Sequence, residues 1–258
     1  MNTIKVKCPA KINLDLKVFK KDTTTGFHPI KSTMQAISLF DFLTIKLENK
    51  EGIFLSGNSK EIPYDEKNLC YKAAKLFFDS INETPRISIN IEKNIPVCAG
   101  LAGGSTDGAG VVFGLNKLFK TPLDKTKLHE LLSKLGSDLN FCLEGGTKLC
   151  EKRGEKLTNS AFCDFELSLV KPKNLKISAK EAYEAFDNLN EPSVFKNDLE
   201  FALLNRHKEL RFLNSKGMQM SGSGPTFFIK KSTIDFDLDK EYTVIEHLHT
   251  IPYGIETI

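Results

Sequence analysis

The sequence lacks any apolar run long enough to cross a bilayer, and its six cysteines form no Cys-x-x-Cys pair. The first absence argues against a transmembrane helix, which needs about 20 consecutive apolar residues. The second argues against a zinc site or a disulfide framework, so a reducing cytosol is the expected compartment. The first residues alternate like a strand and lack the apolar core of a signal peptide, which also favours a cytoplasmic protein.

A strong charge bias is missing too. The 36 basic and 33 acidic residues are dispersed and give a net charge of +3, without the basic stripe that is usual in nucleic-acid-binding proteins. We find no internal repeat and no low-complexity segment. A chain of 258 residues with 40% hydrophobic side chains therefore fits one large domain or two modest ones.

Two common phosphate-binding signatures, Gly-Lys-Ser/Thr and Gly-x-Gly-x-x-Gly, are also absent. The chain has instead a glycine-rich loop over residues 93–107, between an expected strand and an apolar helical pattern. Glycines let backbone amides approach an anion, and a helix N-terminus favours negative charge. We interpret the loop as a polyphosphate cradle, with a helix that starts at Ser105 or Thr106. Taken alone, the same loop fits a flexible turn about equally well.

Three polar residues outside this loop are candidates for function, and each also has an ordinary explanation. Lys11 lies in an alternating segment, where periodicity alone makes it a solvated lysine. His28 lies in a loop, where local evidence favours an ordinary polar residue. Asp138 follows Gly136, which we expect to end a helix in the left-handed conformation. Its carboxylate is therefore either partly buried and functional or the cap of the next turn.

Hydrophobic periodicity predicts a mixture of strands and helices with a boundary near residue 159. A second glycine-rich loop, at residues 220–225, leads into a strand, and the tail after residue 231 stays undecided between strand and helix. The main expected strands are 4–8, 12–18, 32–42, 43–47, 87–91 and 165–169, a short hairpin is expected within 52–63, and the main expected helices are 68–78, 123–135, one from 178, and 197–215.

Three motifs now stand in order along the chain: Pro-Ala-Lys-Ile-Asn-Leu at 9–14, the loop at 95–107, and Met-Ser-Gly-Ser-Gly-Pro at 220–225. In this order and spacing they resemble the three motifs of the GHMP kinases, small-molecule kinases named for galactose, homoserine, mevalonate and phosphomevalonate. The resemblance covers about residues 5–228 and implies a two-domain α+β fold with the active site between the domains. The N-terminal domain (1–158) would be similar to the second domain of ribosomal protein S5, and the C-terminal domain (159–258) would be ferredoxin-like.

The resemblance also implies the reaction. The opening motif, with Gly26-Phe27-His28 after it, is most similar to the branch that uses ATP to phosphorylate a cytidine-diphosphate conjugate of methylerythritol, on the non-mevalonate route to isoprenoid precursors. ATP and Mg²⁺ are the implied cofactors. The implied partner is a small-molecule substrate, with no nucleic acid and no membrane, and the chain would act as a monomer or a homodimer.

Residue roles follow from the same match. Lys11 and Asp138 correspond to the catalytic pair, in which the aspartate takes the proton of the acceptor hydroxyl and the lysine keeps it ionised. His28, with the backbone of Phe27, corresponds to the cytosine-recognising position, and Tyr183 to the aromatic ring that stacks on the base. The remaining implied substrate contacts are Asn13, Ser221 and Gly222. The implied ATP contacts are Asn68, Leu69, Lys93, Pro96, Val97, Cys98, Ala99, Gly100, Leu101, Ala102, Gly103, Gly104, Ser105 and Thr106.

Some positions depart from the family pattern or stay open. Phe27 replaces the usual tyrosine, Asn140 replaces a usual proline, and Ala102 replaces a glycine, which a negative φ at that position would tolerate. The metal ligands are not assigned, because the hydroxyls of Ser105 and Thr106 fit equally.

Two rival functions remain at this stage. Another GHMP kinase, of the homoserine or mevalonate type, would have no need of the base-recognising residues His28 and Tyr183. A non-catalytic nucleotide- or RNA-binding module is the second rival, because S5-like folds also occur in RNA-binding proteins. The retained Lys11 and Asp138 argue against that module.

Overall fold

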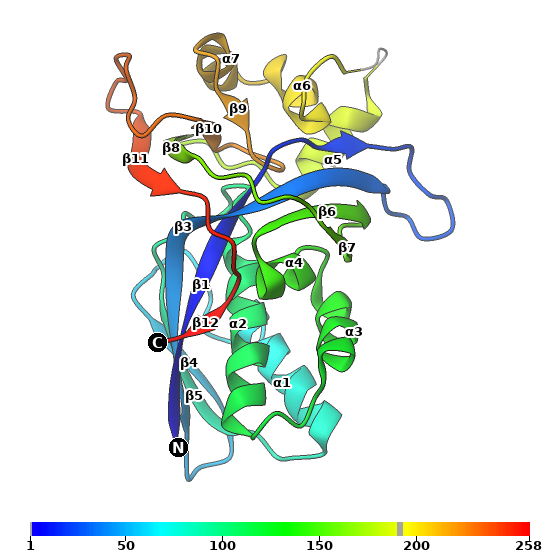
Figure 1. Cartoon of the computed structure of the whole chain (residues 1–258), viewed down its shortest axis with the longest axis vertical. Helices are drawn as coiled ribbons and strands as arrows, with labels where there is room; N and C mark the ends of the chain where they lie inside the picture. The colour runs from blue at the N-terminus through cyan, green and yellow to red at the C-terminus, as the bar shows by residue number, and fades with distance from the viewer. Residues whose placement is uncertain (1, 190–192) are drawn as a thin grey trace.

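The computed structural model describes residues 2–189 and 193–258 and shows two layered parts, one above the other (Figure 1). The lower part is an eight-stranded sheet in the order β12-β1-β3-β5-β4, with β2, β6 and β7 joined to it through β3, and helices cover one face. The strands are β1 (Thr3–Asn13), β2 (Lys17–Val18), β3 (Ile30–Leu47), β4 (Gly52–Gly57), β5 (Arg86–Glu92), β6 (Thr147–Lys152), β7 (Lys156–Asn159) and β12 (Glu256–Thr257). The helices are α1 (Leu69–Ile81), α2 (Gly103–Leu118), α3 (Lys125–Leu135) and α4 (Leu139–Glu144).

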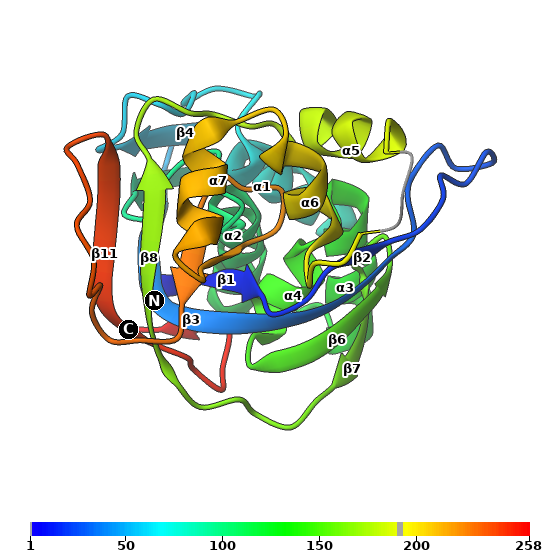
Figure 2. The same cartoon turned by 90° about the horizontal axis from the view of Figure 1, so that it is seen from above.

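The upper part is a four-stranded antiparallel sheet in the order β11-β8-β10-β9, packed against three helices (Figure 2). Its strands are β8 (Glu166–Pro172), β9 (Gln219–Met220), β10 (Phe227–Ile229) and β11 (Tyr242–His249), and its helices are α5 (Ala179–Asp187), α6 (Asp198–Leu204) and α7 (Lys208–Ser215). Together the two parts confirm the expected α+β class. Among the described residues, no helix has the length and apolar character needed to cross a membrane.

The boundary expected at residues 158 and 159 falls between β7 and β8. The chain nevertheless returns to the first sheet at its end, because β12 pairs with β1. The division into residues 1–158 and 159–258 stays a prediction, and the undecided tail after residue 231 contains two strands, β11 and β12.

Strand β3 corrects the expectation of two strands at 32–42 and 43–47. It runs unbroken over 18 residues because it pairs with β1 on one side and with β5 and β6 in succession on the other. A register shift in β1 between Pro9 and Ala10 absorbs the curvature that so long a strand requires. The residues expected to form a hairpin within 52–63 contain β4, which pairs in parallel with β5 instead.

Glycines bring α2 close to the sheet. A Cβ atom on Gly110 would lie 2.4 Å from Cys8 Sγ, and one on Gly114 would lie 2.7 Å from Ile45 Cδ1. A side chain at either position would have to displace Cys8 or Ile45, so glycine at both positions favours the close packing of α2 on the sheet. The N-terminus of α2 is thereby held beside β1, the strand that carries Lys11.

Two further helix expectations are wrong. Helix α2 begins at Gly103, because the loop turns into the helix at Ala102, whose φ is +59° and whose carbonyl accepts a bond from Thr106 N. Ser105 and Thr106 therefore lie in the first turn, and Ala102 does not have the negative φ expected of it. The helix expected over 197–215 is two helices, α6 and α7, because the backbone turns at Arg206 and His207, which both donate to Leu203 O.

Candidate active site

A cavity of about 560 Å³ lies between the two parts of the molecule. The glycine-rich loop, the end of β1 and the segment before α4 line it from the first part. Helix α5, the N-terminal turn of α6 and the second glycine-rich loop line it from the second part. Residues that are far apart in the sequence therefore face a single space.

Lys11 and Asp138 face each other in this cavity. Lys11 Nζ lies 3.9 Å from Asp138 Oδ2, 2.6 Å from Asn13 Oδ1 and 3.0 Å from the carbonyl oxygen of Gly100. The lysine side chain is 4% exposed and the aspartate side chain 29% exposed. Asn13 and Gly100 thus hold the buried ammonium, while the Asp138 carboxylate stays partly exposed to the cavity and can contact a ligand.

Asp138 is placed by a turn that differs from the expected one. Gly136 has φ 169°, which is extended backbone, so the expected left-handed helix end at this residue is wrong. Asp138 stands at the N-cap of α4, but its side chain makes no capping hydrogen bond. The alternative role of Asp138 as the cap of the next turn is therefore not supported, and its carboxylate points to the cavity instead.

The glycine-rich loop forms the opposite wall. Gly100 has φ +72°, and a Cβ atom there would lie 2.2 Å from Ser221 O, so only glycine allows the two glycine-rich loops to meet. Gly104 is different, because a Cβ atom on it would have nothing within 4 Å. Gly103, Gly104 and Ser105, in the first turn of α2, line the cavity, where a phosphate chain would meet the helix N-terminus.

A buried ionic cluster supports this wall. Lys93 Nζ pairs with both Asp41 Oδ2 and Asp107 Oδ2, the latter at 2.9 Å, and all three side chains are at most 4% exposed. Burial lowers the pKa of Lys93, but the two carboxylates outweigh it and hold the pKa above its usual value. Burial raises the pKa of Asp107, and Lys93 opposes that shift by favouring the carboxylate. Lys93 thus fixes the start of α2 from beneath the loop.

Asn68 has a local structural task at the other end of the cavity. Its Oδ1 accepts a bond from Cys70 N and caps α1, while its Nδ2 donates to the carbonyl oxygen of Pro63 at 2.6 Å. Leu69 follows it on the cavity wall beside Ile62. This apolar end offers a surface for a flat ring.

The residues expected to recognise cytosine lie close together. The rings of His28 and Tyr183 stack with centroids 5.2 Å apart and an interplanar angle of 24°. His28 Nδ1 lies 2.9 Å from Phe19 O, and its Nε2 lies 3.3 Å from Asp187 Oδ1. Burial, with a further contribution from Asp138, raises the pKa of Tyr183 to about 12, so its hydroxyl stays protonated.

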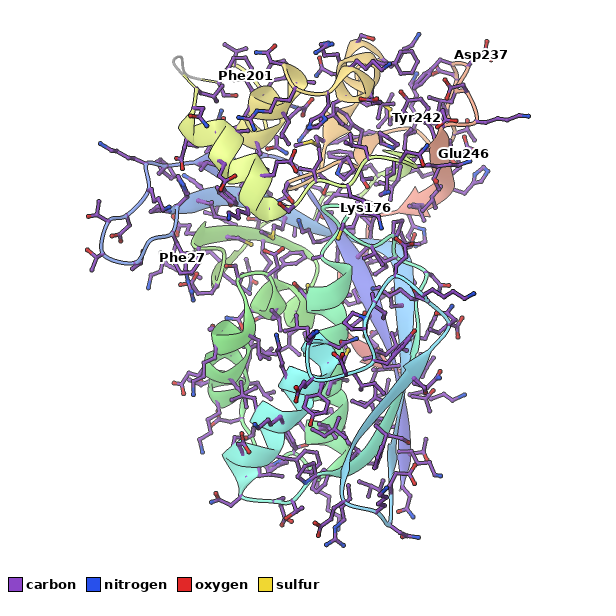
Figure 3. All side chains as sticks on the ribbon, turned by 180° about the vertical axis from the view of Figure 1, so that it is seen from behind. Phe27, Lys176, Phe201, Asp237, Tyr242 and Glu246 are labelled. Carbon is purple, nitrogen blue, oxygen red and sulfur yellow. The ribbon has the colours of Figure 1, made fainter. Side chains whose placement is uncertain are left out.

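Phe27 is on the outer side of this group. It is 53% exposed, and the Arg153 guanidinium lies 5.2 Å from its ring centroid. Figure 3 shows Phe27 on the loop between β2 and β3, on the side of the molecule where α5 lies. Tyr183 lines the cavity, whereas Phe27 and His28 do not.

Most of the residues expected at the site line this one cavity. Those that do are Lys11, Asn13, Asn68, Leu69, Lys93, Pro96, Val97, Cys98, Ala99, Gly100, Ala102, Gly103, Gly104, Ser105, Asp138, Tyr183 and Gly222. Leu101, Thr106 and Ser221 lie behind it, where the Leu101 carbonyl accepts a bond from Lys11 N and Ser221 Oγ donates to Gly100 O.

Sequence reasoning missed several lining residues. Asp107 is the last residue of the expected loop, but the motif match gave it no role of its own. Ser137 and Arg153 carried no local signal, and Leu16, Ile30, Met34 and Leu199 looked like ordinary core residues.

Comparisons with known proteins agree with this geometry. Residues 68–146 match the GHMP kinases N terminal domain. The protein named 4-diphosphocytidyl-2-C-methyl-D-erythritol kinase from Clostridium botulinum (strain Alaska E43 / Type E3) is 43% identical over 253 residues, which cover 86% of this chain and 89% of that relative.

Solved structures give the same picture. A crystal structure of 4-(cytidine 5'-diphospho)-2C-methyl-D-erythritol kinase has a TM-score of 0.72 and 27% identity, covering 87% of this chain and 89% of that one. Homoserine kinase from Cytophaga hutchinsonii has a TM-score of 0.75 at 15% identity, covering 100% and 98% of the two chains, which shows the shared fold.

The chain therefore belongs to the GHMP kinase family, and it is a small-molecule kinase that uses ATP. Within that family its relatives at about this level of identity are 4-diphosphocytidyl-2-C-methyl-D-erythritol kinases.

Proposed function

We propose that this kinase transfers the γ-phosphoryl group of ATP to the 2-hydroxyl of 4-diphosphocytidyl-2-C-methyl-D-erythritol, in the non-mevalonate pathway to isoprenoid precursors. One observation carries the proposal. The Lys11–Asp138 pair lies in a cavity with a glycine-rich phosphate cradle on one side and the stacked pair His28–Tyr183 near the other. A kinase for homoserine or mevalonate would need the first two features but not the third.

The transfer itself rests on positioning and charge. Asp138 Oδ2 would accept a hydrogen bond from the acceptor hydroxyl and take its proton as the new bond to phosphorus forms. Lys11, whose Nζ lies 3.9 Å from Asp138 Oδ2, would offset negative charge on the group being transferred. Because Lys11 Nζ is already held by Asn13 and Gly100, little reorganisation is needed during the reaction.

The phosphate chain of ATP would lie along the first turn of α2. Gly103, Gly104 and Ser105 line the cavity there, a Cβ atom on Gly104 would meet nothing within 4 Å, and the helix dipole favours the negative charge. The adenine ring would lie toward Asn68 and Leu69, at the apolar end of the cavity.

The proposal includes Mg²⁺ bound with ATP. The described residues contain no group of three or more His, Cys, Asp or Glu side chains placed to hold a metal, which fits an ion bound mainly by nucleotide phosphates and water. Ser105 lines the cavity and Thr106 does not, so Ser105 is the hydroxyl we expect to reach the ion. When bound, Mg²⁺ neutralises the β- and γ-phosphate charge.

Cytosine would be recognised by ring stacking and by hydrogen bonds to one edge. Tyr183 supplies a ring on the cavity wall, and Phe27 supplies a second, exposed ring beside His28. The proposal also includes a cytoplasmic location, which the six free cysteines support, and action as a monomer or a homodimer.

The test compares two acceptors that differ only in the base. We expect the wild-type enzyme to phosphorylate the cytidine-diphosphate conjugate much faster than the uridine-diphosphate conjugate of the same polyol, because a pocket built to bond one base edge rejects the other. Equal kcat/KM values for the two conjugates would contradict cytosine recognition.

A further inference from the structure

Asn197 lies at the point where the second part of the molecule reaches the catalytic strand. Leu16 N donates to Lys196 O at 2.8 Å, and Asp198 N donates to Leu16 O at 2.9 Å. The backbone on both sides of Asn197 is therefore bonded to the segment that follows β1. The Asn197 side chain is completely buried.

The side-chain amide of Asn197 uses all four of its hydrogen-bonding positions. Its Oδ1 accepts from Leu199 N at 3.0 Å and from Glu200 N at 3.3 Å, which caps α6. Its Nδ2 donates to Met220 O and to Gly222 O, both at 2.9 Å. One end of the amide thus stabilises a helix, and the other end holds the second glycine-rich loop.

The held loop touches the catalytic lysine. Gly222 has φ +56°, and a Cβ atom on it would lie 2.9 Å from Lys11 Nζ, 3.0 Å from Gly100 O and 3.2 Å from Asn13 Oδ1. A side chain at Gly222 would therefore crowd the Lys11 ammonium and the two oxygens that hold it, so the bare Gly222 backbone lies directly beside this group. A shift of this loop would change the space available to the lysine.

A neighbouring residue keeps the loop folded independently. Glu200 Oε2 accepts a bond from Met220 N at 2.9 Å, and its Oε1 accepts one from Asn214 Nδ2 at 2.8 Å. Loss of the Asn197 amide would consequently loosen the loop at Gly222 without detaching it at Met220. Because Glu200 still holds Met220, the effect of Asn197 on Gly222 can be measured separately.

We propose that Asn197 is a positioning residue for phosphoryl transfer: its amide holds Gly222 against the Lys11 ammonium and thereby fixes that ammonium beside Asp138. The inference rests on the proposed roles of Lys11 and Asp138. It assigns Asn197 no contact with the substrate, and it predicts an effect on kcat that passes through Lys11.

The first test uses Asn197→Ser. Serine still caps α6 because it is a good N-cap residue, but its short side chain cannot reach the carbonyls of Met220 and Gly222. We expect kcat to fall by about 10- to 100-fold, the usual effect of a misplaced catalytic group, while both KM values stay within about twofold. Asn116→Ser is the matched control, since Asn116 is buried and bonds twice to Leu123 far from the site.

The control should lose stability but keep wild-type kcat. A general structural role for Asn197 would lower the melting temperature of both variants and leave kcat unaffected in both. An Asn197→Ser enzyme with kcat within twofold of wild type would therefore overturn the proposal.

The second test asks whether the effect passes through Lys11. In the Lys11→Met background, adding Asn197→Ser should cause no further loss of kcat, because the group that it positions is gone. A crystal structure of Asn197→Ser should show Lys11 Nζ displaced from its position 3.9 Å from Asp138. An additive loss in the double variant, or an unmoved lysine, would contradict the positioning role.

These outcomes are separable from failure of the proposed function. If the wild-type enzyme rejects the cytidine-diphosphate conjugate, that proposed substrate is wrong. The ratio of Asn197→Ser to wild-type kcat is then measured with the acceptor that the enzyme does phosphorylate, and the variant structure is read in the same way.

Discussion

At the scale of single residues, the Lys11 ammonium is nearer to two neutral oxygens than to the carboxylate it faces. It lies 2.6 Å from Asn13 Oδ1 and 3.0 Å from Gly100 O, but 3.9 Å from Asp138 Oδ2. A tighter lysine–aspartate pair would compete with the acceptor hydroxyl for the carboxylate. The observed spacing leaves the Asp138 carboxylate free to bond the acceptor hydroxyl.

Asp138→Asn tests this reading. The change keeps the size of the side chain but removes the base, so we expect kcat to fall by about two to four orders of magnitude, the usual contribution of a general base. Steady-state turnover measures it. Asp124→Asn is a suitable control, because Asp124 caps α3 and asparagine caps equally well. Near-normal turnover by Asp138→Asn would refute the assigned role.

His28→Ala tests base recognition. His28 stacks on Tyr183 and does not approach the glycine-rich loop, so its loss should affect the substrate and not the nucleotide. We expect KM for the cytidine-diphosphate conjugate to rise about 10-fold, or about 1.4 kcal/mol, with KM for ATP unchanged, because Tyr183 loses the ring that it stacks on. Equal increases in both KM values would contradict the assignment.

At the scale of elements, the start of α2 combines structural and binding roles. Gly104 lies in the first turn of α2 and borders open space, so nothing in the protein itself requires a glycine there. Glycine in a helix costs stability relative to alanine. The remaining reason for a glycine is the approach of a ligand.

Gly104→Ala should therefore make the protein more stable and at the same time weaken its binding of ATP. We expect the free energy of unfolding to rise by up to about 1 kcal/mol, or a few degrees in Tm, and KM for ATP to rise because the methyl group occupies the phosphate cradle. Thermal unfolding and initial rates at varied ATP measure the two effects. Gly217→Ala is a control for ATP binding, since Gly217 lies in a turn with φ +75° and should only lose stability. Unchanged ATP affinity in Gly104→Ala would mean that the phosphates lie elsewhere.

The packing of α4 against its neighbours predicts a pH dependence of stability. Glu144 lies 2.9 Å from His129 Nε2, 2.9 Å from Lys125 Nζ and 3.2 Å from Lys148 Nζ. His129 first, with both lysines adding to it, lowers the pKa of Glu144 from 4.5 to about 2. A lowered folded-state pKa stabilises the fold above the unfolded pKa, and this contribution is lost as pH falls from about 4.5 toward 2.

Glu144→Gln should therefore be less stable than wild type at pH 7. The difference should shrink as pH falls below about 4.5, because the wild-type carboxylate then loses its advantage on protonation. Chemical unfolding at several pH values measures the difference. A constant difference between pH 7 and pH 3 would show that Glu144 acts through packing and not through charge.

At the scale of the whole molecule, local patterns predicted the pieces of the site better than their arrangement. The glycine-rich loop was found because a strand, a run of glycines and an apolar helix follow one another directly. Lys11 and Asp138 were ordinary by periodicity, and only the three-motif resemblance brought them together. The structure places them 3.9 Å apart.

The features of the site that sequence patterns do not predict depend on contacts between residues far apart in the chain. The ion pairs of Lys93 join residues from three separate segments, and the role of Asn197 depends on carbonyls more than 20 residues away. The continuity of the 18-residue strand β3 depends on β6 pairing with residues 30–35 and β5 pairing with residues 42–47, and these long-range pairings are not visible in its local pattern. The positive φ of Ala102 arises from loop closure, which residue type alone does not reveal.

We expect the cavity between the two parts of the molecule to determine which acceptor the kinase phosphorylates. The most direct measurement is ATP-dependent phosphorylation by the wild-type enzyme of 4-diphosphocytidyl-2-C-methyl-D-erythritol, homoserine and mevalonate, tested side by side. We predict rapid turnover of the first and background rates with the other two. Turnover of homoserine or mevalonate in preference to the cytidine-diphosphate conjugate would contradict the proposed function.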